Sequence, residues 1–271
     1  MRGIAQILLP HPRPIAPEAQ APGVSALRVG LCRKSHPGEA GELALADAYE
    51  IQRAVIDHRL VRGAAMVGVK MGFTSEAKMI QMGLKDQIWG RLTSDMVVAN
   101  GDVMDRARFI HPRVEPEIAV RLKAPLTGEV NREEAFAAVD AVAPALEIID
   151  SRYENFRFAL GDVVADNASS SAFVMGDWLP ADTDVADVPM VMSVDGAVVE
   201  TGSSAAILDD PIRSLVAAAR LAGATGLTLQ PGWTVMLGGA TAAAAMRAAH
   251  TVSLDAGPLG RVGFFIEGGA A

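Results

Sequence analysis

The sequence predicts a mixed α+β fold, in which one domain is built on a folded-over antiparallel sheet. The C-terminal third of the chain reads as a series of short apolar strands with a single helix between them. The chain shows no internal repeat and no obvious linker. Its 271 residues, of which 50% are hydrophobic, are enough to form a substantial core. These observations together favour one domain.

The N-terminal segment 1–24 differs from the rest of the chain in its proline content. Proline cannot lie inside a helix and donates no amide hydrogen to a sheet. We therefore expect residues 1–24 to form an extended arm and residues 25–271 to form the single domain. The prolines of this segment are Pro10, Pro12, Pro14, Pro17 and Pro22.

The elements of the N-terminal half begin with a helix over residues 42–62, where apolar residues recur at helical spacing and Gly63 provides a stop. The apolar run 65–69 predicts a strand that places Lys70 at its end. An exposed lysine is the alternative there. Thr74 or Ser75 is expected to cap a helix over 76–82 that stops at Gly83. A loop (88–92), a strand (95–98) and a turn (100–102) follow.

In the second half, strands are expected at 115–120 and around Glu147, separated by an alanine-rich helix over 133–142. Residues 151–162 mix aromatic and charged side chains, which is the composition of a loop that folds over another part of the molecule. The small polar residues of 163–170 fit a turn or a substrate cradle. The dipeptide Asp195-Gly196 predicts a hairpin of strands 190–194 and 197–200.

A helix over 212–221 follows, capped near Asp209 or Asp210 with Pro211 in its first turn. A strand (234–237) then runs into Gly238-Gly239, where the backbone can come close to a ligand or to another strand. Strands at 251–254 and 261–266 complete the sheet.

Three glutamates stand out within these apolar segments. On a strand, side chains alternate between faces, so Glu115 and Glu117 project from one face while Ile118 and Val120 take the other. Two carboxylates on one face repel, and a divalent cation with oxygen ligands compensates best. Glu147, between Leu146 and Ile148, is a third candidate ligand. The alternative is that Glu115 and Glu117 lie on the solvated face of an edge strand.

Composition excludes several classes of partner. The net charge of −8 disfavours nucleic acid or an anionic membrane, because either would select a basic surface. Cys32 is the single cysteine, which excludes an intramolecular disulfide and fits a reducing cytoplasm. No apolar run reaches membrane-spanning length, and the apolar piece from Ile4 to Leu9 is too short for a secretory signal. We expect a cytoplasmic protein.

Four segments follow one another along the chain: Gly68-Val69-Lys70-Met71-Gly72-Phe73-Thr74-Ser75, Pro112-Arg113-Val114-Glu115-Pro116-Glu117-Ile118-Ala119, Glu147-Ile148-Ile149-Asp150-Ser151-Arg152 and Val164-Ala165-Asp166-Asn167-Ala168-Ser169-Ser170. Together, and in this order, they resemble one enzyme group: the 2-keto-4-pentenoate hydratases and 2-oxohex-3-enedioate decarboxylases of the fumarylacetoacetate hydrolase superfamily. The resemblance runs from about Leu45 to Ile266.

The resemblance implies a mixed β-roll or sandwich with flanking helices, which would make residues 25–271 a catalytic domain. It also implies Mg2+ or Mn2+ bound by three carboxylates, and a 2-oxo acid substrate chelated through its keto oxygen and carboxylate. Carried over by position, the metal ligands are Glu115, Glu117 and Glu147, and Lys70 is the acid/base or charge-stabilising residue. The substrate-binding candidates are Met71, Gly72, Ser169, Thr241 and Arg152.

Within this group, the sequence favours the decarboxylases. The hydratases that it resembles carry an acidic residue just before an aromatic-glycine pair, where this sequence has Ile88 before Trp89-Gly90. An apolar residue there removes a proton acceptor and favours a reaction without water. Three further segments look more like the decarboxylase branch: 151–158, 78–83 and 123–126. The expected substrate is thus a 2-oxo dicarboxylic acid, 2-oxohex-3-enedioate.

Several points stay open at this stage. The rivals are a hydratase that adds water to 2-oxopent-4-enoate and a non-catalytic partner of a hydratase paralogue. Complex formation with such a paralogue, self-association and the preferred metal are also open. Arg152, His111 and Lys123 are candidates for the cation that faces the departing carboxylate. Segment 245–250 lacks the Pro-Gly-Asp turn expected in the family and has His250 where an acid is usual, so we expect an altered surface or assembly there.

Overall fold

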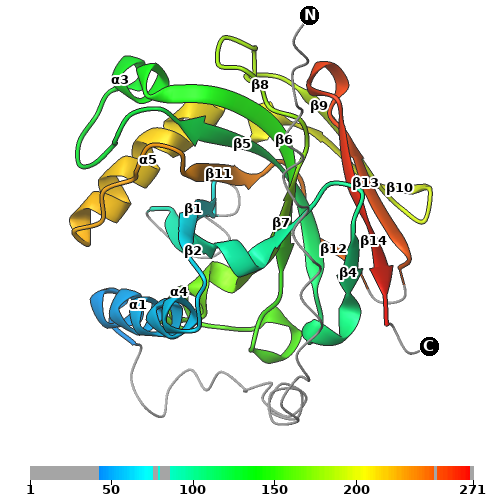
Figure 1. Ribbon diagram of the computed structural model, residues 1–271, viewed down its shortest axis with the longest axis horizontal. Coiled ribbons are helices and arrows are strands. Elements are labelled where there is room, and N and C mark those ends of the chain that lie inside the picture. The colour runs from blue at the N-terminus through cyan, green and yellow to red at the C-terminus, as the bar shows by residue number, and fades with distance from the viewer. Residues whose placement is uncertain (1–42, 76–78, 80–85, 247–248, 269–271) are drawn as a thin grey trace, which may run out of the picture.

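The computed structural model describes residues 43–75, 79, 86–246 and 249–268. These residues form two β-sheets with helices at their margins (Figure 1). The predicted arm (1–24) and the predicted helix over 76–82 lie outside the described residues, apart from Met79. No helix among the described residues is long and apolar enough to cross a membrane.

The larger sheet has nine strands and contributes many of the buried apolar residues. Its main path runs in the order β2-β1-β11-β5-β6-β7-β3, with β12 paired to β5 and β8 paired to β6. In Figure 1, β5 and β6 bend over β1 and β2, which gives the sheet its rolled shape. The bounds are β1 Met66–Gly72, β2 Ile88–Thr93, β3 Val97–Val98, β5 Arg113–Leu122, β6 Val139–Ile149, β7 Ser170–Met175, β8 Leu179–Pro180, β11 Thr234–Gly239 and β12 Ala244–Ala245.

The smaller sheet has five strands in the order β10-β9-β13-β14-β4 and stands at one side of the larger one (Figure 1). The predicted hairpin is confirmed: Asp195 and Gly196 have φ values of 50° and 79°, and both central positions of a type I′ turn require positive φ. The amides of His250 and Thr251 donate to the Asp195 carboxylate at 2.8 Å, so His250 takes part in a surface turn. The bounds are β4 Val103–Asp105, β9 Pro189–Val194, β10 Ala197–Ser203, β13 Thr251–Asp255 and β14 Arg261–Glu267.

Four α-helices flank the sheets among the described residues. The predicted first helix is α1 (Leu45–Val61), which packs against α4 (Leu160–Ala165) below β2 (Figure 1). The predicted last helix is α5 (Pro211–Ala224), where the carboxylate of Asp210 caps the amide of Ile212 at 3.0 Å. The fourth helix is α3 (Arg132–Ala137). Single 3-10 turns lie at 94–96, 106–108, 154–156, 167–169, 204–206 and 257–259.

Three expectations about the elements are wrong. Residues 88–92 form a strand rather than a loop, because β2 pairs with β1 along its length and is buried throughout. The helix predicted over 133–142 ends at Ala137, and β6 begins at Val139, where its residues pair with β5. The sheets are not purely antiparallel, since β1–β11, β3–β7 and β4–β14 are parallel pairs. The predicted α+β class with flanking helices is confirmed.

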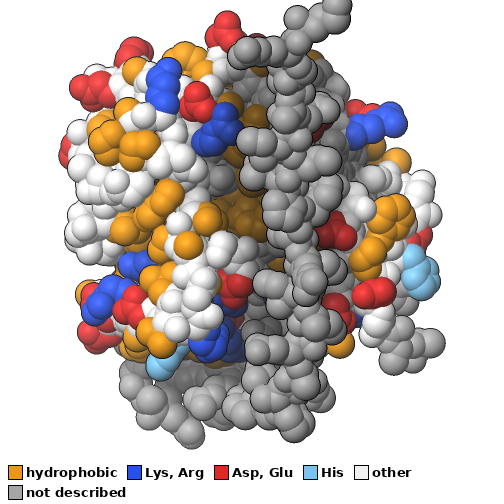
Figure 2. All heavy atoms as spheres, viewed as in Figure 1, with side chains coloured by type: hydrophobic (Ala, Val, Ile, Leu, Met, Phe, Trp, Pro, Cys, Tyr) orange, Lys and Arg blue, Asp and Glu red, His pale blue; other side chains and the backbone are white. Residues whose placement is uncertain are grey.

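Charged side chains of both signs are interspersed over the face seen in Figure 2, and the described residues on that face form no large basic patch.

Candidate metal centre

Glu115, Glu117 and Glu147 converge on one point of the larger sheet. Glu115 lies directly opposite Glu147 in the antiparallel register of β5 and β6, and Glu117 follows two residues further along β5 on the same face. One carboxylate oxygen from each residue lies within 4.8 Å of the other two. Such spacing lets one ion contact all three, because oxygen ligands stand about 2.0–2.6 Å from Mg2+ or Ca2+.

The alternative of a solvated edge strand is wrong for this pair. The strand β5 has β11 on one side and β6 on the other, so it is interior to the sheet. The side chains of Glu117 and Glu147 are fully buried. Burial and the neighbouring carboxylate of Glu147 raise the pKa of Glu117 well above its usual range, and burial also raises the pKa of Glu147. Buried carboxylates this close together repel one another, so their ionised forms need positive charge nearby.

Lys70 supplies part of that charge from β1, which is separated from β5 by the strand β11. Its ammonium lies 2.9 Å from Oε2 of Glu147 and donates to the carbonyl oxygen of Ala168 at 3.3 Å. Burial alone would lower the pKa of Lys70, but the carboxylates of Glu147, Glu117 and Glu115 outweigh it and raise the pKa above its ordinary value. Lys70 is 3% exposed, so the alternative of an exposed strand-end lysine is wrong. The single charge of one lysine cannot balance three carboxylates in their ionised form.

The glycine pair at the end of β11 shapes the same site. The amide of Gly238 donates to Oε2 of Glu117 at 2.9 Å. Oε1 of Glu117 is buried and has no hydrogen-bond partner among the described residues. A Cβ atom on Gly239 would stand 3.1–3.3 Å from the carboxylate of Glu115, which is tighter than ordinary contact. The backbone here makes room for the carboxylates, and the orphaned oxygen fits a metal ligand.

A cavity of about 270 Å³ opens beside Lys70 and Glu115. It includes three of the predicted substrate-binding residues, Met71, Gly72 and Ser169. The hydroxyl of Ser169 is buried and lacks a hydrogen-bond partner among the described residues, so it is free to bind an oxygen of a ligand. The rest of the wall consists of Phe73, Thr74, Ile88, Ile149, Phe156, Phe158, Val163, Ala168 and Gly239.

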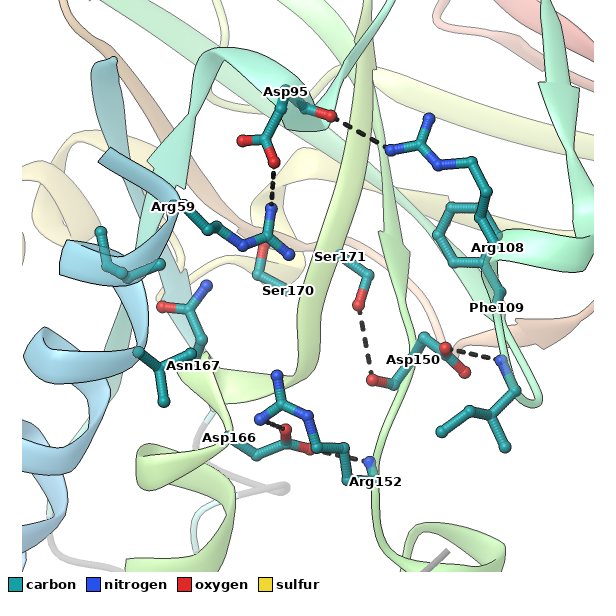
Figure 3. Close-up of a pocket in the computed structure, with 13 residues that line it drawn as sticks. Arg59, Asp95, Arg108, Phe109, Asp150, Arg152, Asp166, Asn167, Ser170 and Ser171 are labelled. Atoms are coloured by element: carbon teal, nitrogen blue, oxygen red, sulfur yellow. Dashed lines mark hydrogen bonds and ion pairs between the residues drawn. The ribbon is translucent and has the colours of Figure 1, made fainter. Parts of the chain in front are cut away.

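The structure does not bring Arg152 or Thr241 to this cavity. Arg152 belongs to a second cavity, of about 170 Å³, where its guanidinium lies 2.6 Å from the carboxylate of Asp166. Figure 3 shows Arg152 turned toward Asp166, with Asp150 across the cavity. Thr241 follows the glycine pair, and its hydroxyl donates to the carbonyl oxygen of Ala242 at 2.9 Å. In this geometry Arg152 forms an ion pair with Asp166 instead of lining the cavity beside Lys70.

The Arg152–Asp166 pair leads to a pH-dependent expectation. Burial raises the pKa of Asp166 to about 6, while Arg152 acts to lower it. An acid whose folded-state pKa is raised binds more protons when folded, so its contribution to stability falls as pH rises from about 4 to about 6. Replacing Arg152 by Met should strengthen this trend and destabilise the protein by about 1–2 kcal/mol at pH 8, because the pair is half-exposed on the arginine side.

Thermal unfolding at pH 5 and pH 8 measures this effect. The double variant Arg152→Met with Asp166→Asn is the control, since it removes the buried charge together with its partner, and its loss should be similar at both values. An equal loss at both values in the single variant would contradict the assignment of Arg152 to Asp166.

Comparison with known proteins identifies the family. The fumarylacetoacetate (FAA) hydrolase C-terminal family matches residues 66–265, and the chain therefore belongs to it. Within the family, the chain is similar to 4-oxalocrotonate decarboxylases. One from Pseudomonas sp. is 55% identical over 237 residues, which cover 87% of this chain and 93% of the relative. One from Pseudomonas putida is 43% identical over 224 residues, covering 82% and 85%.

A hydratase is a more distant relative. The 2-keto-4-pentenoate hydratase of Burkholderia vietnamiensis is 34% identical over 248 residues, which cover 90% of this chain and 92% of the relative. Among solved structures, the 4-oxalocrotonate decarboxylase from Pseudomonas putida G7, complexed with magnesium and adipate, matches with a TM-score of 0.80 and 40% identity over 83% of this chain and 87% of that chain.

Sequence reasoning missed much of the cavity wall. Phe156 and Phe158 reach it from the loop 151–159, where composition indicated only a cover over something. Asn155 and Phe156 both have positive φ, near 55°, and a phenylalanine gives no signal for that conformation. Ile149 and Val163 also line the cavity, and Val163 falls within the segment 163–170 that fitted a turn or a substrate cradle. No local pattern could have assigned the two phenylalanines to the site before the loop was placed.

Proposed function

We propose that the protein decarboxylates 2-oxohex-3-enedioate (4-oxalocrotonate) to 2-hydroxypenta-2,4-dienoate and CO2, with Mg2+ or Mn2+ as its cofactor. The chain is a carboxy-lyase of the decarboxylase branch of its family, since the 55% and 43% identical relatives are both 4-oxalocrotonate decarboxylases. The carboxylate cluster and the cavity beside it support a small-molecule dicarboxylic acid as substrate.

The reaction needs a place for negative charge. The bond between C5 and C6 breaks, its electron pair forms the C4–C5 double bond, and the original double bond shifts so that charge develops on the keto oxygen. Glu115, Glu117 and Glu147 would hold a divalent cation, which would supply Lewis-acid stabilisation for that charge. The residues of the chain set the rest of the environment.

Lys70 is the residue best placed for proton transfer and charge stabilisation. Its ammonium group is held by Glu147 and the Ala168 carbonyl at the wall of the cavity, and its raised pKa keeps it charged. A fixed positive charge in a buried site stabilises a developing anion more strongly than it would in water. The unpaired hydroxyl of Ser169 offers a hydrogen bond to a substrate oxygen.

The observation that carries the choice between decarboxylation and hydration is Ile88. Its side chain is 3% exposed and lies in the cavity wall beside Gly72. An isoleucine at this point neither accepts a proton nor orients a water molecule, so the wall favours release of CO2 over addition of water.

An assay of both substrates with Mg2+ tests the proposal. CO2 release from 2-oxohex-3-enedioate, abolished by a chelator and restored by Mg2+ or Mn2+, is the expected result. Hydration of 2-oxopent-4-enoate without CO2 release from the dicarboxylate would overturn it in favour of the hydratase. A complex with a hydratase paralogue and self-association stay predictions, testable by size-exclusion chromatography coupled to light scattering.

A further inference from the structure

Arg113 lies in the same row of side chains as the metal ligands. It is on β5, two residues before Glu115, and alternation places Arg113, Glu115 and Glu117 on one face of the strand. In the register of the sheet it faces Ile149 of β6 on one side and Ala245 of β12 on the other. Two residues along a strand correspond to roughly 7 Å.

The guanidinium of Arg113 stacks on the ring of Phe156, with its central carbon 4.3 Å from the ring centroid. The imidazole of His111 contacts the same ring, at 4.9 Å between centroids. Phe156 also lines the metal-side cavity. Phe156 thus borders the metal-side cavity and also contacts both basic side chains.

A pocket of about 100 Å³ is bordered by His111, Arg113 and Phe156, and we call it the basic pocket. Its lining contains no aspartate or glutamate: it consists of Arg106, His111, Pro112, Arg113, Asn155, Phe156 and Ala245. Arg106 donates to the carbonyl oxygens of Phe109 and Ile110 at 2.9 and 3.2 Å. No carboxylate of the described residues lies within ion-pair distance of Arg113, so its positive charge is not neutralised there.

The loop that carries Asn155 and Phe156 adopts a backbone conformation that is unfavourable for phenylalanine. Asn155 and Phe156 have φ values of 55° and 56°, in the left-handed region that a phenylalanine seldom adopts. Conformations of this kind persist only where the surrounding structure fixes them, and they gather at ligand sites. The side chains of His111 and Arg113 both contact the ring of Phe156, a residue that borders both cavities.

We propose that Arg113, with His111 beside it, receives the distal carboxylate of the dicarboxylic substrate. This inference rests on the proposed function. An extended six-carbon diacid places its distal carboxyl carbon about 5 Å beyond its keto carbon, comparable with the offset between Glu115 and Arg113 along β5. A guanidinium stacked by its face leaves its N–H groups at the edge, where a carboxylate can take two of them.

The other candidate cations are placed less well. Lys123 is exposed at the opposite end of β5, and Arg152 is paired with Asp166 in the second cavity. His111, by contrast, belongs to the basic pocket. Arg113 was not among the sequence candidates for this role, because its placement depends on the loop that carries Phe156.

The distal carboxylate loses its charge during the reaction, and this predicts how the loss of Arg113 should affect KM and kcat. The distal carboxylate is fully charged in the bound substrate and neutral once it has become CO2, so a cation there stabilises the ground state at least as much as the transition state. Arg113 is therefore a substrate-binding and specificity residue. Its loss should raise KM much more than it lowers kcat.

The test compares two inhibitors with the Mg2+-loaded protein: 2-oxohexanedioate, which lacks the conjugated double bond, and the monocarboxylate 2-oxohexanoate. The unmodified protein should bind the diacid about 10- to 100-fold more tightly, which is the range of a charge-assisted hydrogen-bonded pair. Arg113→Met and Arg113→Gln should each reduce this ratio to within about threefold by weakening diacid binding alone, and should raise KM for the substrate by a similar factor.

Arg121→Met is the matched control. Arg121 also lies on β5 and packs on an aromatic ring, that of Trp178 at 5.0 Å, but near the other end of the strand. It should leave the inhibitor ratio unchanged. An undiminished ratio in both Arg113 variants, with Mg2+ affinity and melting temperature intact, overturns the inference while leaving the proposed function in place. Absence of CO2 release by the unmodified protein overturns the proposed function instead, and the inhibitor ratio is measured independently of turnover.

Discussion

Replacing Glu147 by Gln should lower the rate of CO2 release by about a thousandfold, on the expectation that a lost metal ligand removes about 4 kcal/mol of transition-state stabilisation. Glutamine keeps the shape of the side chain but provides a neutral oxygen. Since Glu147 is fully buried and opposite Glu115, no exposed group can take its place. The affinity for Mg2+ should fall together with turnover.

Turnover is measured as CO2 release at saturating substrate, and Mg2+ affinity by calorimetric titration. Glu133→Gln is the matched control, because Glu133 is exposed on α3 and distant from the cluster in the sheet. It should leave both quantities unchanged. Full turnover in Glu147→Gln with an unaltered Mg2+ titration would refute the assignment of Glu147 as a ligand.

Replacing Lys70 by Met should also reduce turnover strongly, by about 100- to 1000-fold, as expected when a charged group aimed at the developing anion is lost. Its effect on metal binding should be the opposite of that of Glu147→Gln. The ammonium of Lys70 lies 2.9 Å from Glu147, so it competes for the same negative charge. Without it the cluster should bind Mg2+ at least as tightly as before.

Lys70→Met should also change the melting temperature, by an amount that depends on whether Mg2+ is present. In the presence of a chelator, Lys70→Met leaves three clustered carboxylates without their buried counter-charge, and the melting temperature should drop below that of the unmodified protein. Mg2+ should close most of this gap, since ligand binding to the folded state adds stability. A variant that loses Mg2+ affinity would show instead that Lys70 supports the site only through packing.

Local sequence chemistry accounts for the parts of the fold that were predicted well. The hairpin at Asp195-Gly196 and the cap of Asp210 on α5 depend on a few neighbouring residues, and both are confirmed. Long-range pairing explains the failures. Residues 88–92 become a buried strand because β1 lies beside them, and the alanine-rich segment around 139–142 follows β5 rather than its helix propensity.

In the candidate site, too, local sequence predicts some features, while others depend on long-range contacts. The spacing of Glu115 and Glu117 indicated one face of a strand, and their register with Glu147 bears out the convergence. Lys70 reaches the cluster because β1 and β5 both border β11, which no local pattern could reveal. Arg152 was carried over from a motif, but its side chain turns toward Asp166, whose place depends on the helix α4 and the turn that follows it.

The interior position of β5 and β6 has a consequence for how an ion would leave the site. Both strands are hydrogen-bonded on two sides, so fraying at the sheet margin does not loosen the carboxylates. Slow amide hydrogen exchange is expected at Glu115 and Glu147 even after chelation. A bound cation should therefore dissociate by way of the open cavity, at a rate set by access for water and chelator, and not by partial unfolding of the protein.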